Sequence, residues 1–71
     1  MKTKRISKNG FTRKLLALTS NYRIQIENYV ISHENQIDHF EYGHDKKRHI
    51  RVYKIVLRNG FSKSWGATRN Y

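Results

Sequence analysis

A strand followed almost directly by a tight turn is the clearest structural signal in this chain. From Ile50 to Leu57 the residues are mostly β-branched or aromatic, a composition that favours a pleated and half-buried strand. Asn59-Gly60 follows after one residue. Because both of these residues tolerate positive φ, the pair is the preferred centre of a two-residue type I′ loop. We therefore expect a β-hairpin whose second strand begins at Phe61.

A two-residue loop would fix which residues of this hairpin lie opposite one another. Counting outward from the loop places Val56 opposite Lys63. It also places Lys54 opposite Trp65, so one face interleaves cations with aromatic rings, while Tyr53 and its apolar neighbours form the core face. Nucleic acids bind such mixed surfaces, because cations contact phosphates and aromatic rings stack on bases. The alternative is a half-buried ribbon whose Lys and Arg stems only cover apolar surface.

The charge of the chain narrows the classes of partner. Its 71 residues carry 15 Lys or Arg against 5 Asp or Glu, a formal net charge of +10. A single small domain of this charge needs an anionic partner, and nucleic acid leads over an acidic protein surface. The chain has no cysteine, so we expect neither a disulfide nor a thiolate zinc site. With no apolar run of membrane-spanning length, we expect a cytoplasmic protein without a membrane partner.

Charge is divided into three blocks. Residues 1–23 carry seven Lys or Arg and no acid, residues 24–45 carry all five acids and no Lys or Arg, and residues 46–71 carry the other eight cations. The acidic block is expected to neutralise the basic segments within the fold; the alternative is a second surface that docks a partner. Residues 1–9 have little apolar content and predict a flexible basic arm that adds phosphate contacts to those of residues 46–63. This leaves residues 10–71 as one β-rich domain.

The remaining segments predict a small antiparallel fold. Residues 11–19 have apolar positions at helical spacing and predict a short helix, although a Lys/Arg-Asn-Gly-Phe motif shared by residues 8–13 and 58–63 leaves a strand open. Residues 22–32 alternate and predict a strand with one β-bulge, and residues 36–42 predict a weaker strand. The predicted fold class is α+β or all-β: a small single domain with an antiparallel sheet of three to five strands and at most one short helix.

The predicted nucleic-acid-binding residues are the cations and aromatic residues of the C-terminal basic block. They are Lys46, Lys47, Arg48, Arg51, Tyr53, Lys54, Arg58, Phe61, Lys63 and Trp65, with Arg69 and Tyr71 as further candidates. The chain has no established RNA- or DNA-binding motif, so this pattern favours phosphate-backbone contacts over base-specific readout. RNA is slightly favoured over DNA because aromatic rings suit unstacked single strands. The sequence therefore predicts a non-catalytic, regulatory nucleic-acid-binding protein.

The histidines, at positions 33, 39, 44 and 49, are the candidates for chemistry. No pair has the i, i+4 or i, i+2 spacing that commonly places two imidazoles on one metal, so no metal or other cofactor is predicted. A base such as His39 or His49 with Glu41 as acid would suffice for attack of an RNA 2′-hydroxyl on its phosphate, with Arg51 nearby. A small basic endoribonuclease is thus one alternative function. The other is a small inhibitor or adaptor that binds an acidic protein.

Overall fold

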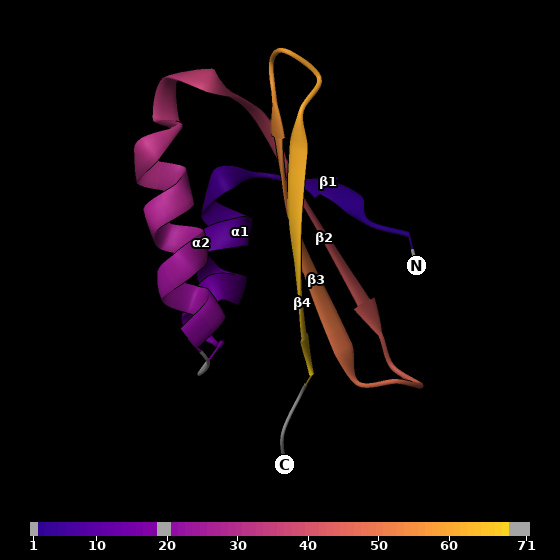
Figure 1. The fold of residues 1–71 in the computed structure, drawn as a ribbon. Coiled ribbons are helices and arrows are strands. Elements are labelled where there is room, and N and C mark those ends of the chain that lie inside the picture. The colour runs from indigo at the N-terminus through magenta and orange to yellow at the C-terminus, as the bar shows by residue number, and fades with distance from the viewer. Residues whose placement is uncertain (1, 19–20, 69–71) are drawn as a thin grey trace.

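The computed structural model of the protein describes residues 2–18 and 21–68. Its elements in chain order are β1 (Lys4–Ile6), α1 (Lys8–Leu16), α2 (Asn21–Ser32), a 3₁₀ helix (Glu34–Gln36), β2 (Ile37–Asp45), β3 (Ile50–Leu57) and β4 (Ser62–Thr68). The four strands form one antiparallel sheet in the order β1-β2-β3-β4, and both helices lie on one face of it (Figure 1). The fold is α+β, as the sequence predicts, but it has two helices where at most one is expected.

Helix α1 is the short helix predicted over residues 11–19, and it begins earlier, at Lys8. The Oγ atom of Ser7 accepts a hydrogen bond from the backbone N–H of Gly10 at 3.1 Å, the usual role of a serine N-cap. Asn9 and Gly10 therefore lie in the first turn of a helix. Their likeness to Asn59-Gly60 does not reflect a shared hairpin turn.

Residues 22–32, predicted as a strand, form helix α2. Ile26 is fully buried, and Tyr29 and Val30 pack against the core one turn later, which is helical spacing. Ile24 points away from the sheet and is 61% exposed. The alternation of apolar residues before Glu27 covers too few positions to separate a strand from a helix, and their β-branched character favoured the wrong choice.

The start of the chain is also more ordered than predicted. In place of a flexible arm over residues 1–9, it forms strand β1 and the first turn of α1. Ile6 pairs with Phe40 of β2 and packs against the core, and Arg5 pairs with Glu41. Ile6 is thus the apolar residue that holds this short edge strand against the core. A strand of three residues is too short to show an alternation of apolar and polar residues in the sequence.

The hairpin of β3 and β4 forms, but its loop is one residue longer than predicted. The backbone N–H of Leu57 donates to the carbonyl of Phe61 at 2.7 Å, and the N–H of Gly60 donates back to Leu57 at 3.1 Å. Gly60 has a φ of 91°, a left-handed conformation that glycine adopts without strain. This is a three-residue loop closed by a glycine, and not the expected two-residue turn.

The extra loop residue shifts the hairpin register by one. Val56 lies opposite Ser62, and Tyr53 lies opposite Trp65. Because side chains alternate between the two faces of a sheet, this shift moves Trp65 and Lys63 to the face covered by the helices. The predicted face of interleaved cations and aromatic rings therefore does not exist in the folded protein.

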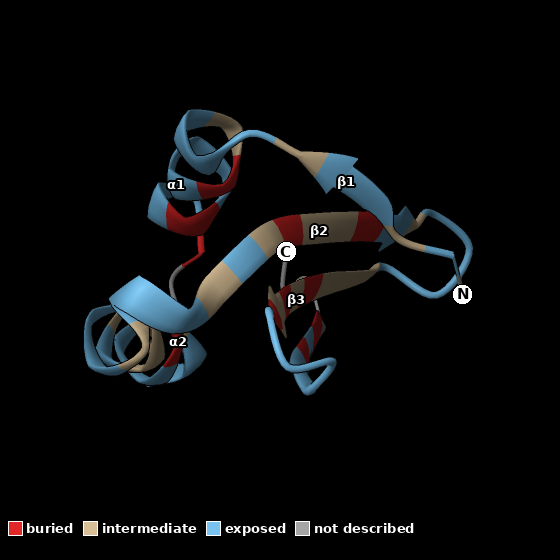
Figure 2. Cartoon of the chain, turned by 90° about the horizontal axis from the view of Figure 1, so that it is seen from above, coloured by how far each residue is buried: buried red, intermediate tan, exposed pale blue. Residues whose placement is uncertain are grey.

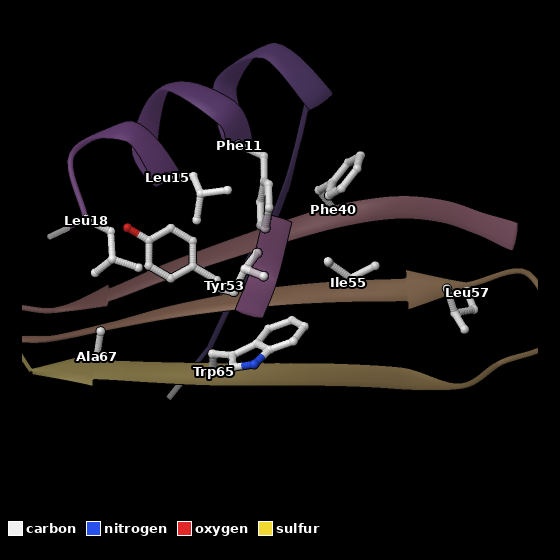
Figure 3. Packing of buried hydrophobic residues seen from close by; sticks show 10 residues of the cluster. Phe11, Leu15, Leu18, Phe40, Tyr53, Ile55, Leu57, Trp65 and Ala67 are labelled. Atoms are coloured by element: carbon white, nitrogen blue, oxygen red, sulfur yellow. The ribbon is translucent and has the colours of Figure 1, made fainter. Parts of the chain in front are cut away.

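The core lies between the helices and the sheet (Figures 2 and 3). Its buried members are Phe11, Leu15, Leu18, Ile26, Phe40, Tyr53, Ile55, Leu57, Trp65 and Ala67. The Phe11 ring lies 4.7 Å from the Phe40 ring, centroid to centroid, and meets Tyr53 edge-on at 5.8 Å. The Tyr53 hydroxyl donates to the carbonyl of Lys14 at 2.9 Å and so ties α1 to the middle of the sheet. Within the described residues no helix is long and apolar enough to cross a membrane.

Candidate nucleic-acid interface

The face of the sheet that carries no helix is here called the open face. Its residues alternate with the core residues along each strand: Arg5, His39, Glu41, Gly43, Asp45, Ile50, Val52, Lys54, Val56, Ser62, Ser64 and Gly66. Arg5 pairs with Glu41, Glu41 pairs with Lys54, and Lys54 pairs with Ser64. Residues paired across antiparallel strands point to the same face, so these four side chains form one polar row across the whole sheet.

The aromatic residues predicted to stack on bases are mostly absent from this face. Tyr53 is fully buried and Trp65 is 6% exposed, so both belong to the core. Burial also raises the pKa of Tyr53. Their assignment as stacking platforms is wrong, and the cause for Trp65 is the one-residue shift of the hairpin. Phe61, which lies opposite Leu57 at the base of the β3–β4 loop, is 71% exposed and remains accessible.

The predicted cations occupy opposite ends of the sheet and not one continuous stripe. Lys46, Lys47 and Arg48 lie in the β2–β3 loop, whereas Arg58 lies in the β3–β4 loop (Figure 1). The two loops flank the eight residues of β3, which span roughly 26 Å at about 3.3 Å per residue. Lys54 lies midway between them, on the open face.

Asp45 shapes the β2–β3 loop. Its Oδ1 atom accepts hydrogen bonds from the backbone N–H groups of Lys47 and Arg48, at 3.0 and 3.2 Å. Its Oδ2 atom lies 3.9 Å from the Nε atom of Arg48, whose side chain is 78% exposed. His49 has a φ of 55° and returns the chain to β3. The Asp45 carboxylate thus fixes the turn, while Lys46, Lys47 and Arg48 stay exposed.

Two predicted cations lie on the helix-covered side. Arg51 is opposite Ala67, on the same face as the core, and its Nε atom is buried without a hydrogen-bond partner among the described residues. The Nζ atom of Lys63 lies 5.5 Å from the ring centroids of both Tyr29 and Trp65, a cation–π arrangement. Neither residue contributes to the open face. Arg69 and Tyr71 lie outside the described residues.

Four of the five acidic side chains form hydrogen bonds or ion pairs with other groups of the protein. Glu27 pairs at 2.7 Å with the arginine one helical turn before it. Asp38 and Glu41 both contact His39, and Asp45 caps its loop. These contacts agree with local neutralisation, the first of the two interpretations of the acidic block. They leave the exposed lysines and arginines as the main source of surface charge.

His39 is the centre of a polar cluster on the open face. Its Nδ1 atom lies 2.6 Å from Asp38 and its Nε2 atom lies 2.7 Å from Glu41, whose second oxygen accepts a hydrogen bond from Thr3. The contacts with Asp38 and then Glu41 raise the pKa of His39. The hydrogen bonds from Thr3 and then His39 lower the pKa of Glu41. Both shifts favour the pairing of a protonated imidazole with ionised carboxylates.

The sequence predicts the orientation of His39 but not the presence of Arg5 beside it. The pattern of β2, with Phe40 and Tyr42 on the inner face, already implies that His39 points the other way. Arg5 is missed because β1 has no detectable period. Among the described residues no group of three His, Asp or Glu side chains is placed to hold a metal ion.

Two grooves lie beside these surfaces. The first has a volume of about 520 Å³, borders the polar cluster at Arg5, Asp38 and His39, and also contacts the start of α1. The second, of about 260 Å³, lies between α1 and α2 and is mostly apolar, with Leu16 and Ile31 at its margin. The first groove is also lined by Ile6 and Phe40 of the inner face and by Val30 of α2, so it opens at the sheet edge between the polar cluster and the helices. The second lies on the helix side.

Comparison with protein-family models, curated proteins and solved structures finds no match to this chain.

Proposed function

We propose that the protein binds the phosphate backbone of nucleic acid along the open face of its sheet. The observation that carries this proposal is the distribution of charged side chains. Four of the five carboxylates contact other groups of the protein, while exposed cations lie at both ends of β3. Arg5 and Lys54 add positive charge between those ends. Phosphate binding by such a surface is driven by counterion release, so it depends steeply on salt.

The spacing of the cations suits an extended strand of nucleic acid. Lys54 is four residues from Ile50 and three from Leu57, so the central cation lies roughly 13 Å from one end of β3 and roughly 10 Å from the other. The side chains between them, such as Val52 and Val56, are compact and leave the surface open to a backbone. With no aromatic ring on the open face, we expect little base preference, and Phe61 supplies the one accessible stacking platform of the predicted set.

The test is fluorescence anisotropy of labelled single-stranded RNA, single-stranded DNA and duplex DNA at about 50 and 200 mM salt. The variant Lys54→Ala/Arg58→Ala should weaken binding and reduce the slope of log affinity against log salt by about two. The matched control Arg13→Ala/Arg23→Ala removes the same charge from the helix side and should change neither quantity much. Equal losses in both variants would remove the open-face assignment, and no binding at the lower salt would refute the proposed function.

The groove between α1 and α2 favours a second candidate function, the binding of an acidic amphipathic helix of a protein partner. Leu16 and Ile31 at its margin are 58% and 72% exposed. Helix α1 contains three cations and no acid, so an apolar helix face bordered by acids would match it. Calorimetric titration with a helical Leu/Glu peptide tests this: Leu16→Glu should abolish binding, whereas Val52→Glu on the open face should not.

A further inference from the structure

The open face brings together the groups that acid–base cleavage of RNA requires. Glu41 pairs in register with Arg5 on one side and with Lys54 on the other, and its carboxylate contacts His39. Arg51, the arginine that the sequence suggests for this role, lies on the opposite face. The structure therefore replaces it with two cations that flank the carboxylate directly.

We propose that Arg5, His39, Glu41 and Lys54 form an RNA-cleaving site. This inference rests on the proposed function, because RNA must lie on the open face to reach these side chains. It also goes beyond that function by adding a reaction, and so departs from the sequence-based expectation of a purely binding protein.

The reaction is an internal transfer within the RNA backbone. The Glu41 carboxylate takes the proton of a 2′-hydroxyl, and that oxygen attacks the adjacent phosphorus. As the new P–O2′ bond forms, the P–O5′ bond breaks, and the His39 imidazolium gives its proton to the departing 5′ oxygen. The products are one strand ending in a 2′,3′-cyclic phosphate and one beginning with a 5′-hydroxyl. The charge that builds on the phosphoryl oxygens is stabilised by Arg5 and Lys54.

The contacts around His39 prepare these proton states. The carboxylates of Asp38 and Glu41 raise the pKa of His39 and so favour the protonated imidazole, while the hydrogen bonds from Thr3 and His39 lower the pKa of Glu41 and favour its ionised form. The roles are thus the reverse of those that the sequence suggests, with histidine as acid and glutamate as base. After the products leave, Glu41 holds a proton that His39 lacks, and their 2.7 Å contact lets that proton return. The site is then ready for another substrate.

The cluster is accessible enough to receive a nucleotide. The side chains of His39 and Glu41 are 18% and 19% exposed, and that of Asp38 is 50% exposed. The adjacent groove of about 520 Å³ falls in the size range of small-molecule sites. A bound nucleotide would separate His39 from Glu41 and replace their mutual contact with one contact from Glu41 to the 2′-hydroxyl and one from His39 to the 5′ oxygen.

The experiment uses the full chain and end-labelled single-stranded RNA, with an all-2′-deoxy strand of the same sequence as the substrate control. We expect cleavage of the RNA alone, with 2′,3′-cyclic phosphate ends. His39→Gln and Glu41→Gln should each slow cleavage about 100-fold or more, and RNA affinity in anisotropy should change no more than about threefold. His33→Gln is the matched control, because His33 stacks on Tyr29 on the helix side and its loss should leave cleavage unchanged.

RNA that binds but stays intact would overturn this inference and leave the proposed binding function standing, whereas RNA that does not bind would overturn both. Cleavage at equal rates by wild type and both variants would assign the activity to a contaminant and also refute the site. If His39→Gln fails to fold, the pH–rate profile of the wild type decides. It should be bell-shaped, falling at low pH as Glu41 takes up a proton and at high pH as His39 loses one. The groups facing this pair are Asp38 on β2, Thr3 just before β1, Arg5 on β1, and Lys54 on β3.

Discussion

His39 lies between two carboxylates of its own strand, β2. The pairing of β2 with β3 shifts register between Ile37 and His39, which makes Asp38 the extra residue of a β-bulge. The imidazole bridges that bulge residue to Glu41, and Glu41 in turn holds Thr3 ahead of strand β1. The contacts that set the proton states of the proposed site therefore also fasten the edge of the sheet, so this cluster couples chemistry to stability.

The free energy of unfolding should be highest between about pH 4.5 and 6.5. The raised pKa of His39 contributes stability that is fully present below its ordinary value of 6.5 and is lost as pH rises through the folded value. The lowered pKa values of Asp38 and Glu41 contribute stability that is present above their ordinary values of 3.8 and 4.5 and is lost as pH falls. Urea unfolding followed by circular dichroism across this pH range measures both limbs.

The variant His39→Gln isolates the alkaline limb of that profile. It should remove most of the decline in stability above about pH 6.5, whereas His33→Gln, which changes a histidine outside the cluster, should retain it. An alkaline decline of the same size in His39→Gln and wild type would show that the cluster does not hold a charged imidazole.

At the scale of elements, α2 is the segment whose assignment has the sharpest mutational test. A strand over residues 22–32 would place Ile24 and Ile26 on the same face, but the helix separates them into one exposed and one buried side chain. Ile26→Ala should cost about 2–5 kcal/mol of unfolding free energy because it opens a cavity in the core. Ile24→Ala should change it by no more than about 0.5 kcal/mol. Similar losses in equilibrium urea unfolding of the two variants would contradict the helix.

The helices and strands differ in how far the sequence predicts them. Strand β3 and the inner face of β2 follow from residue type and alternation, and α1 follows from the spacing of Phe11 and Leu15. Strand β1 is too short to have a pattern. In α2 the β-branched residues favour a strand locally, and only the burial of Ile26 against the sheet makes the helix the better choice.

The candidate site was less predictable because one turn decides it. Asn59-Gly60 fits both a two-residue loop and a three-residue loop ending in a left-handed glycine, and the choice depends on the hydrogen bond between Leu57 and Phe61. A difference of one residue moves Trp65 from the surface to the core. The cations at 46–48, 54 and 58 keep their exposure or face in either case, so charge was the more dependable guide to the interface than aromatic residues.

At the scale of the whole molecule, positive and negative charges are distributed unevenly. The chain has a net charge of +10, and most of its acids are held in short internal contacts. Four of the five exposed large apolar side chains among the described residues belong to α1 and α2, which cover the core on one face of the sheet. The cationic loops lie at the ends of the sheet (Figure 1). One side of the protein therefore suits a packed core and the other suits an anionic polymer.

This distribution predicts that simple salt stabilises the fold. At about 10 mM salt the Debye length is roughly 30 Å, close to the 36 Å long axis of the protein, so its cations repel one another across the whole molecule. At about 150 mM the length falls to roughly 8 Å, which screens that repulsion but leaves contacts of 3 Å largely intact. The melting temperature should therefore rise between these conditions by several degrees, on the order of a 1 kcal/mol gain in a domain of this size.

Calorimetry in sodium chloride measures the effect, and Lys46→Gln/Lys47→Gln is the variant that tests its cause. Removing two exposed charges should raise the melting temperature at low salt and flatten its dependence on salt, because less repulsion remains to be screened. A melting temperature that instead falls as salt is added would mean that surface ion pairs, such as Arg23 with Glu27, outweigh the long-range repulsion. In that case the positive charge would be locally balanced, and the electrostatic basis for binding a phosphate backbone would be lost with it.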